Sequence, residues 1–259
     1  MRGRGKHFIE ERHAEILRLL KENGRVTVVD LCEKFSVSVA TVRSDLDELE
    51  RMGKVRRTHG GAIAEDRDTG PIPFGTRRML YGAEKTAIGK AAAGLVKDGE
   101  VIFIDGGTTA VEMRQHFGEK QGVTIITPSI EVAYWLTTAT SINVYLLNGF
   151  LSRDSLSTTG IPVADSYSQM NISRAFCGAA GLTVQDGLTD LHAGFVEQKK
   201  VICQHARMVI GLVDHSKIGV TSLASFAAFS EIDSIVTDRA LPAEMAQAAS
   251  GQGIEVIVV

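Results

Sequence analysis

The sequence predicts an α/β protein: an N-terminal winged helix-turn-helix joined to a larger α/β domain with a mostly parallel sheet. Residues 1–64 carry apolar side chains at helical spacing, followed by a short basic strand with a glycine turn. Residues 65–78 are polar and hold two of the five prolines, which is typical of a linker. Over residues 79–259, apolar strand-like runs alternate with helical stretches, the pattern of a largely parallel sheet covered by helices.

The composition is that of a soluble globular protein, with 44% hydrophobic and 23% charged residues. The net charge of −3 hides an asymmetry, because residues 1–64 hold 13 Lys or Arg against 10 Asp or Glu and the rest of the chain is acidic. A polyanion partner is therefore expected only at the N-terminal domain. The three cysteines form no C-x-x-C pair, and the chain shows neither a signal-peptide pattern nor an apolar run of the ~18 residues that span a membrane. These features predict a cytoplasmic protein with no membrane partner.

Three short helices are expected in the N-terminal domain. The first covers Glu11 to Glu22 and ends at Asn23-Gly24, where the glycine suits a left-handed cap. Thr27 caps the second helix, and residues 36–38 form a tight turn. A third helix begins at Ser38 or Thr41 and carries one apolar stripe, made by Val42, Leu46, Leu49 and Met52.

A helix, a tight turn, a second helix and a basic β-wing together predict a DNA-binding unit. In that arrangement the second helix enters the major groove with its N-terminal residues at the base edges, and basic wing residues contact phosphates. The residues expected to contact operator double-stranded DNA are Thr27, Ser38, Val39, Thr41, Arg43, Ser44, Arg56, Arg57 and His59. The alternative is a plain three-helix bundle with a solvated charged face.

Seven apolar runs predict the strands of the second domain. They are VIFI at 101, VTIIT at 123, NVYLL at 143, RAFCGAA at 174, MVIGLVD at 208, DSIVTD at 233 and IEVIVV at 254. Helices are expected between most of them, including residues 84–95, 109–117 and 197–206. The order of the strands in the sheet does not follow from these patterns.

The run FIDGGTTA at 103–110 joins a predicted strand to a predicted helix. Backbone N–H groups at such a junction point outward and bind anions, and Gly106 and Gly107 let the backbone approach a ligand closely. Polar clusters follow other strand ends, where parallel sheets bind ligands. The residues expected to bind a small molecule are Asp105, Gly106, Gly107, Thr108, Thr109, Ser129, Asn148, Gly149, Arg153, Asp190, Glu197, Lys200, Asp214 and Lys217. Each cluster is, alternatively, an ordinary polar loop, and Asp105 either bonds a sugar hydroxyl or ties its own loop.

Residues 26–62 resemble the winged helix of DeoR-family transcriptional regulators. The resemblance is carried by TVRSDLDELE at 41–50 and RTHGGA at 57–62. Ser44 stands where the family has the second of two arginines, so Arg43 is the one arginine of the motif. The resemblance implies a transcriptional regulator, with repression of carbohydrate-metabolism genes as the expected role.

The resemblance continues over about residues 77–240, which are similar to the sensor domain of that family. The matching segments are Lys85 to Ile88, DGGTT at 105–109, TPS at 127–129, NGFL at 148–151, GLT at 187–189, Glu197 with Lys200, and DHSK at 214–217. Pro128 and Asn148 replace the family's Asn and Gly. The resemblance implies an effector, a sugar phosphate or a related metabolite, that alters DNA affinity. It also implies a homo-oligomer (dimer or tetramer), since operators are often paired half-sites.

That sensor domain is also similar to ribose-5-phosphate isomerase, which supplies a rival function. An isomerase needs a base beside the carbonyl, and the isomerase segment Asp-Gly-Ala-Asp-Glu corresponds here to CGAAG at 177–181, where no acid remains. Glu197 and Lys217 remain as groups for a polar substrate, so the lost acids favour sensing over catalysis without closing the alternative. A third possibility is an architectural DNA-binding protein with an inert second domain. The sequence shows no recognised metal-ligand spacing, and no metal or cofactor is expected.

Overall fold

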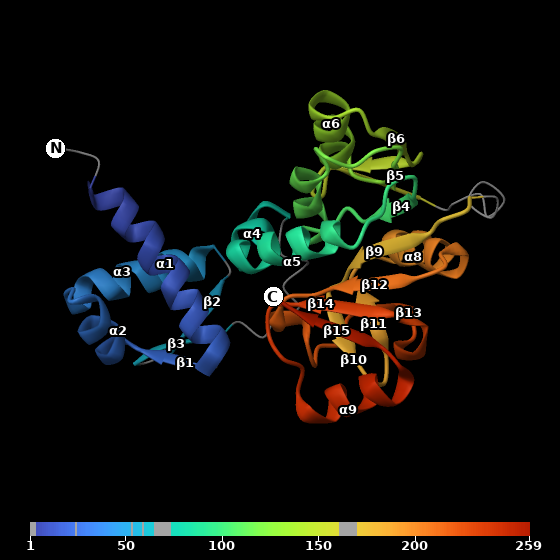
Figure 1. Cartoon of the computed structure of the whole chain (residues 1–259). Coiled ribbons are helices and arrows are strands. Elements are labelled where there is room, and N and C mark those ends of the chain that lie inside the picture. The colour runs from blue at the N-terminus through green and yellow to red at the C-terminus, as the bar shows by residue number, and fades with distance from the viewer. Residues whose placement is uncertain (1–3, 24, 53, 59, 65–73, 161–169) are drawn as a thin grey trace. The chain divides into compact units, whose positions relative to one another are not determined.

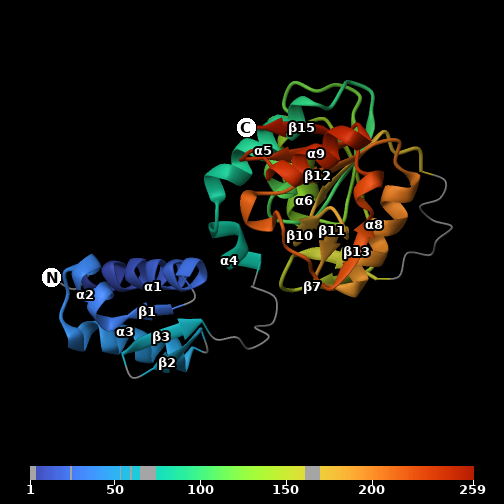
Figure 2. The same ribbon diagram turned by 90° about the horizontal axis from the view of Figure 1, so that it is seen from below.

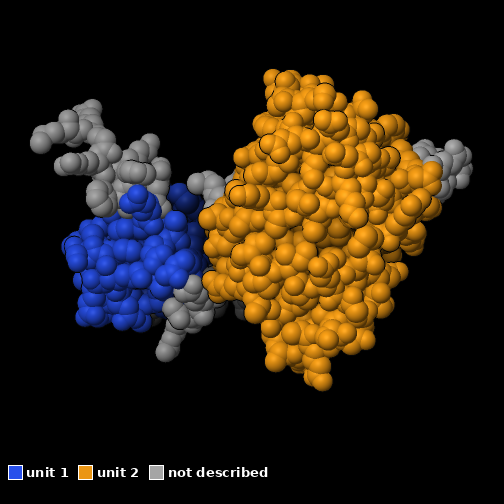
Figure 3. Space-filling view, in the orientation of Figure 1, with its two compact units in different colours: residues 1–70 blue, residues 71–259 orange. Residues whose placement is uncertain are grey.

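The computed structural model describes residues 4–23, 25–52, 54–58, 60–64, 74–160 and 170–259. The chain divides into two compact units, residues 1–70 (unit 1) and residues 71–259 (unit 2), which are coloured separately in Figure 3. Unit 1 has one hydrophobic cluster of its own and unit 2 has two. Within the ranges just given, no helix is both long enough and apolar enough to cross a membrane.

Unit 1 is a winged helix-turn-helix, as predicted (Figure 1). Its helices are α1 (Arg4–Asn23), α2 (Val28–Phe35) and α3 (Val39–Arg51). Its strands are β1 (Arg25–Thr27), β2 (Val55–Thr58) and β3 (Gly61–Ala64), which form an antiparallel sheet in the order β1-β3-β2. Strand β1 was not among the sequence-based expectations, because three residues give too short a run for a period-2 pattern.

Local hydrogen bonds set the turn between α2 and α3. The Thr27 hydroxyl accepts a hydrogen bond from the Asp30 N–H at 3.2 Å, and the Ser38 hydroxyl accepts one from the Thr41 N–H at 3.1 Å. Both predicted caps are therefore present, and of the two candidates for the start of α3 the structure selects Ser38. Ser36 takes a left-handed conformation, with φ 51°, where α2 ends.

Seven parallel strands form the main sheet of unit 2, and each corresponds to one of the predicted runs. They are β4 (Val101–Ile104), β5 (Thr124–Thr127), β6 (Asn143–Leu146), β9 (Arg174–Gly178), β12 (Val209–Leu212), β14 (Ser234–Thr237) and β15 (Glu255–Val258). Their order is β15-β14-β12-β9-β4-β5-β6, with every pairing parallel.

Both faces of the sheet are covered, because successive side chains of a strand point to opposite faces. In β4, Ile102 and Ile104 join one cluster and Phe103 joins the other. The first cluster packs under α5 (Gly82–Gly94), the 3₁₀ helix η1 (Ala110–His116) and α6 (Ile130–Ala139). The second packs under α8 (Ala193–His205), α9 (Ala243–Gln252) and a small antiparallel sheet (Figures 1 and 2).

Several short elements were not predicted. They are β7 (Phe150–Ser152), β8 (Ser157–Thr159), β10 (Gly181–Thr183), β11 (Gly187–Asp190), β13 (Ala224–Ala227), η2 (His215–Lys217) and η3 (Phe229–Glu231). Strands β10, β11 and β13 form the small sheet, and β7 and β8 form a two-stranded one. Segments of three or four residues leave no readable period, which is why the sequence missed them.

Two predicted elements differ in the structure. The segment expected as the linker, residues 65–78, contains most of helix α4 (Phe74–Met79), while residues 65–73 lie outside the described ranges. Phe74 is buried against the cluster under α5, an anchor that the polar composition of the segment concealed. The helix expected at 109–117 is the 3₁₀ helix η1, in which the Glu112 N–H donates to the Thr109 carbonyl.

Candidate functional sites

The order of the strands reverses between β4 and β9. From β4 the chain adds β5 and β6 on one side, and from β9 it adds β12, β14 and β15 on the other. Such a reversal opens a crevice beyond the carboxyl ends of the two strands, where α/β sheets bind ligands. Strand β4 ends just before Asp105, and the Gly178 N–H at the end of β9 donates to Oδ2 of Asp105 at 3.2 Å.

A buried lysine joins two aspartates at this crevice. Nζ of Lys199, on α8, lies 2.9 Å from Oδ2 of Asp105, 2.6 Å from Oδ2 of Asp190 and 2.8 Å from the Gly178 carbonyl oxygen. Lys199 and Asp105 are each only 3% exposed. Burial lowers the pKa of Lys199, but the two carboxylates outweigh it and leave that pKa above its ordinary value. Burial raises the pKa of Asp190, and the charge of Lys199 outweighs burial and leaves that pKa lowered.

The loop after β4 presents backbone N–H groups to the crevice. Across the part of the chain that the structure describes, the N–H groups of Gly106, Gly107 and Thr108 donate to no protein acceptor. A Cβ at Gly106 would lie 2.2 Å from Oγ of Ser157, so the packing of this loop requires glycine there. Unpaired N–H groups before a helical turn are suited to bind an anion or a hydroxyl oxygen.

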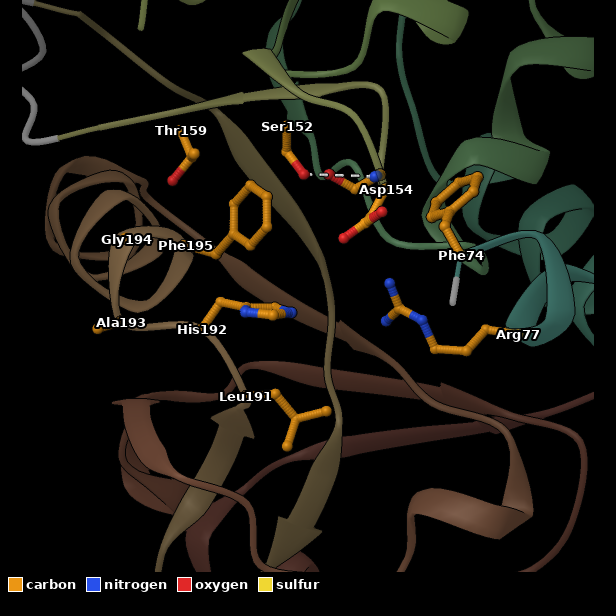
Figure 4. A pocket seen from close by; sticks show the side chains of 11 residues that line it. Phe74, Arg77, Ser152, Asp154, Thr159, Leu191, His192, Ala193, Gly194 and Phe195 are labelled. Atoms are coloured by element: carbon orange, nitrogen blue, oxygen red, sulfur yellow. Dashed lines mark hydrogen bonds between the residues drawn. The ribbon is translucent and has the colours of Figure 1, made fainter. Parts of the chain in front are cut away.

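Two adjoining hollows lie beside this loop. The inner hollow, of about 30 Å³, is lined by the loop glycines and by the Lys199 cluster. The outer hollow, of about 450 Å³, is shown in Figure 4. The two share four lining residues, Arg77, Ser155, His192 and Phe195. The inner volume admits one or two water-sized groups, whereas the outer volume has the size of a small-molecule site.

Two buried polar atoms of residues lining the hollows have no partner among the described residues. They are Nε of Arg77 and Oγ of Ser155. Figure 4 shows Arg77, which comes from α4, facing Asp154 and His192 across the outer hollow. Buried polar atoms are normally paired, so these two point to a polar ligand.

Lys85, the lysine of the family motif in unit 2, holds the C-terminal end of α4 by hydrogen bonds. It is 4% exposed, and its Nζ donates to the carbonyl oxygens of Arg77 and Leu80. Burial lowers the pKa of Lys85 to about 8, and the charges of Asp214 and Lys217 act on it in opposite directions. Asp214 and Lys217 therefore lie near Lys85 rather than on the wall of the hollows.

The structure brings together only some of the residues expected to bind the ligand. Asp105, Gly106, Gly107 and Asp190 line the inner hollow. The others do not line either hollow: Thr108, Thr109, Ser129, Asn148, Gly149, Arg153, Glu197, Lys200, Asp214 and Lys217. Asp105 ties its own loop through Gly178 and Lys199, which was one of the two roles expected for it.

Some of these outlying residues form local contacts within their own elements. Ser129 caps α6 by accepting the Val132 N–H, and Asp214 caps η2 by accepting the Ser216 N–H. Glu197 and Lys200 pair with each other on the exposed side of α8, with 4.0 Å between Nζ and Oε1. Of the two neighbouring lysines, Lys199 reaches the crevice, whereas the predicted Lys200 lies on the exposed side of α8.

Lys199 falls within the apolar pattern of α8. On α8 the buried apolar residues Val196, Ile202 and Cys203 recur at helical spacing, and position 199 falls on that same face. A lysine on a buried helix face needs a partner. Position 200 is also at helical spacing from Val196 and Cys203, so periodicity alone does not separate the two lysines. No comparable signal marks Arg77, Ser155, His192 or Phe195. Arg77 comes from the segment expected as a linker, Ser155 from the short loop between β7 and β8, and His192 and Phe195 from the start of α8.

The N-terminal part of α3 presents an exposed surface suited to DNA. Ser38, Val39, Arg43 and Ser44 are exposed there, and Val39 keeps 48% of its surface. Val42, Leu46 and Leu49 face inward and pack against α1 and α2. Thr41 is half-buried, with its hydroxyl 2.9 Å from that of Ser38, and Thr27 is exposed at the start of α2. The side chain of Arg56 and the whole of His59 lie outside what the structure describes.

Ion pairs fix α3 to its neighbours. Asp45, the aspartate of the TVRSDL motif, is 4% exposed and accepts two hydrogen bonds from Arg12, at 2.8 and 3.0 Å. Arg57 of the wing donates to the Arg43 carbonyl at 3.1 Å and pairs with Asp47. Arg57, expected to contact phosphate, is thus engaged in holding the wing against α3.

Sequence comparisons match both units to one family. The sequence model of the DeoR C-terminal sensor domain matches residues 81–239, and that of the DeoR-like helix-turn-helix domain matches residues 12–68. The HTH-type transcriptional repressor GlcR of Bacillus subtilis is 34% identical over 253 residues, which cover 97% of this chain and 96% of GlcR. The HTH-type transcriptional regulator GolR of Listeria innocua is 32% identical over 232 residues, or 90% of this chain and 91% of GolR.

Among solved structures, ribose 5-phosphate isomerase A of Methanocaldococcus jannaschii covers 53% of this chain and 55% of its own, with a TM-score of 0.38 and 24% identity. The sorbitol operon regulator SorC of Klebsiella pneumoniae covers 93% of this chain and 97% of its own, with a TM-score of 0.39 and 11% identity. The sequence matches span nearly the whole chain and include both units. The chain therefore belongs to the DeoR family of transcriptional regulators.

Proposed function

We propose that unit 1 binds operator DNA, that the hollows of unit 2 bind a sugar phosphate or a related anionic polyol, and that this ligand weakens operator binding. The observation that carries the ligand proposal is the pocket at the strand reversal, with its charged cluster and its unpaired Arg77 and Ser155 atoms. Repression of carbohydrate-metabolism genes is favoured by relatives such as GlcR, a transcriptional repressor, and by a glycerol-3-phosphate regulon repressor of Escherichia coli. A DNA-bound regulator would work in the cytoplasm.

Charge and size favour one orientation of the ligand. The inner hollow has room for only one or two water-sized groups, and Asp105 and Asp190 would repel a phosphate there. A hydroxyl group suits that position, since it can donate to a carboxylate and accept from a loop N–H. The anionic group then lies in the outer hollow near Arg77, whose guanidinium matches phosphate oxygens. The exposed carboxylate of Asp154 lies in the same hollow and suits a further hydroxyl.

The decisive experiment combines DNA selection with ligand release. The protein would first select the duplexes that it binds from a random pool. Its affinity for these duplexes would then be measured with and without each member of a panel of triose, pentose and hexose phosphates. At least one member should change operator affinity by about 5- to 150-fold, which corresponds to ~1–3 kcal/mol of coupling. Unchanged operator affinity across the whole panel would contradict a sensor for this class of ligand.

The isomerase alternative is tested with the same panel. Asp105 and Asp190 both bind Lys199, and the lowered pKa of Asp190 makes its carboxylate a weak base. We therefore expect the pure protein to bind a sugar phosphate without converting it to an isomer. Catalytic turnover, detected by NMR of the sugar, would favour an isomerase.

Arg77→Gln should weaken binding of the sugar phosphate by at least about tenfold, because a charge-assisted hydrogen bond of ~1.5–3 kcal/mol is lost. Isothermal titration calorimetry with the sugar phosphate measures this directly. Arg207→Gln, at an exposed position outside both hollows, is the matched control and should bind as the wild type does. Equal affinities for the Arg77 variant and the control would show that the anionic group lies elsewhere.

We further propose that unit 2 forms a homo-oligomer through the β6 edge of its sheet. Among the described residues, strand β6 pairs with β5 and with no other strand. An open strand edge can pair with the same edge of a second copy. Large exposed apolar side chains accompany this edge on α6, β6 and β7: Tyr134, Tyr145, Leu146, Phe150 and Leu151.

The double variant Tyr145→Glu, Phe150→Glu should shift the protein to monomer, because it places charges in an apolar contact. Sedimentation equilibrium measures the mass. Leu223→Glu, which changes a residue that is 68% exposed elsewhere, should leave the mass unchanged. A wild-type protein that sediments as a monomer would refute the oligomer, and a double variant with wild-type mass would refute this edge.

A further inference from the structure

Helix α4 carries two adjacent arginines in different surroundings. Successive helical residues lie about 100° apart around the axis, so neighbours face different directions. Arg77 lines both hollows. The next residue, Arg78, places Nη1 2.8 Å from Oε1 of Glu131 and Nη2 3.8 Å from Oε1 of Glu112. The two arginines therefore join the pocket on one side of α4 to a pair of acids on the other.

The two acids belong to elements of the main body of unit 2. Glu112 is on η1 and Glu131 is in the first turn of α6. The buried Arg114 also pairs with both, at 3.4 Å and 3.1 Å. Arg114 is 8% exposed in its side chain and Arg78 is 41% exposed. Arg114 contacts both acids, so neither carboxylate loses its last cationic partner when Arg78 detaches.

Among the residues whose side chains the structure describes, two further contacts hold the ends of α4. Phe74 is buried at the N-terminal end, and Lys85 binds the Arg77 and Leu80 carbonyl oxygens at the C-terminal end. Toward the N-terminus, the chain continues from Phe74 through residues 65–73 to the wing strand β3. Helix α4 is thus the first element of unit 2 after the segment that connects it to unit 1, and it also forms part of the pocket wall.

We propose that α4 transmits ligand occupancy to unit 1, with Arg78 and its two acids as the contact that distinguishes the two positions of the helix. The inference rests on the function proposed above and adds the route of regulation. An anion that draws Arg77 toward the outer hollow moves the backbone of α4, and the exposed pair of Arg78 is the contact that yields. Arg78 lines neither hollow, and it acts by positioning α4.

The test measures operator affinity with and without the sugar phosphate that changes the wild-type value most. Arg78→Gln should bind that sugar phosphate with an affinity within about threefold of wild type. Its affinity for the selected DNA should also lie within about threefold of wild type in one of the two conditions, with or without the sugar phosphate. Its operator affinity should differ by less than about twofold between the two conditions, against the 5- to 150-fold change expected of wild type. Arg78→Lys keeps the charge and should restore at least part of the response.

Two controls separate coupling from folding. Arg207→Gln should respond as the wild type does, and the unfolding midpoint of Arg78→Gln, followed by fluorescence of the single tryptophan Trp135 on α6, should stay close to wild type. A full response in Arg78→Gln would overturn the role of α4 while leaving the proposed function standing. A wild-type protein that responds to no sugar phosphate would overturn both.

Discussion

Lys199→Met is expected to lower the free energy of unfolding of unit 2 by about 3–5 kcal/mol, the cost of removing one partner from a buried ion pair. Methionine nearly preserves the side-chain volume, so the loss comes from charge rather than from a cavity. Asp105 and Asp190 would be left close together in a buried site without a cation. Urea unfolding followed by Trp135 fluorescence measures the change, because the only tryptophan of the chain lies in unit 2.

Lys200→Met is the matched control, since it removes the same charge from the exposed face of the same helix. It should change the unfolding free energy by less than about 0.5 kcal/mol, as a surface substitution does. If both variants lost the same stability, the buried cluster would have no special part in the fold.

The unfolding free energy should depend on pH differently in the wild type and in Lys199→Met. The lowered pKa of Asp190 means that its contribution to stability is present above its ordinary pKa of about 3.9 and is lost as pH falls below it. In the variant, burial without a cation raises the pKa of Asp190, so acid neutralises its carboxylate and relieves its repulsion with Asp105. The difference in unfolding free energy between the wild type and Lys199→Met should therefore become smaller as the pH is lowered from 7 to 4. A constant difference would contradict the charge explanation.

Arg43→Ala should weaken binding of the selected operator by about 5- to 150-fold, or ~1–3 kcal/mol, the cost of losing an arginine contact to a base edge or a phosphate. Arg43 is exposed at the start of α3, and its backbone carbonyl, which accepts a hydrogen bond from Arg57, is untouched by the substitution. Fluorescence anisotropy of labelled duplexes at fixed salt measures the affinity, and sugar-phosphate affinity should stay unchanged.

Arg51→Ala provides the control on the same helix. Arg51 is exposed in the last turn of α3, away from the end that the helix-turn-helix arrangement directs at the bases. Its removal should cost markedly less affinity than removal of Arg43. If operator binding survived Arg43→Ala at raised salt, α3 would not enter DNA as proposed.

The fold was more predictable than the pocket, for reasons visible at single residues. All seven strands of the main sheet come from apolar runs, because both faces of a parallel sheet are buried. The caps Thr27 and Ser38 were also predictable, since their hydrogen bonds are local. Lys199, Arg77 and Ser155 meet only because the strand order brings the ends of β4 and β9 together, and that order is not encoded in any local pattern.

Two residues of the family motif have buried partners that the sequence did not indicate. Asp45 is buried and accepts hydrogen bonds from Arg12. Lys85 is buried as well and donates to carbonyl oxygens at the end of α4. Arg57 looked like a phosphate contact because the wing is basic, yet its side chain binds Asp47 and the Arg43 carbonyl. Alternation and charge show which side chains are polar, whereas only the packing shows which partner each one has.

The reversal of strand order also has a consequence for synthesis on the ribosome. The hydrogen bond between Gly178 and Asp105 spans 73 positions, and the lysine that completes the cluster comes later still, so the pocket forms only after most of unit 2 has been translated. Unit 1 has its own core within the first 64 residues and can fold long before that point. A nascent chain would therefore acquire the helix-turn-helix well before it acquires a ligand site, and during that interval its DNA-binding surface would be beyond the control of any metabolite.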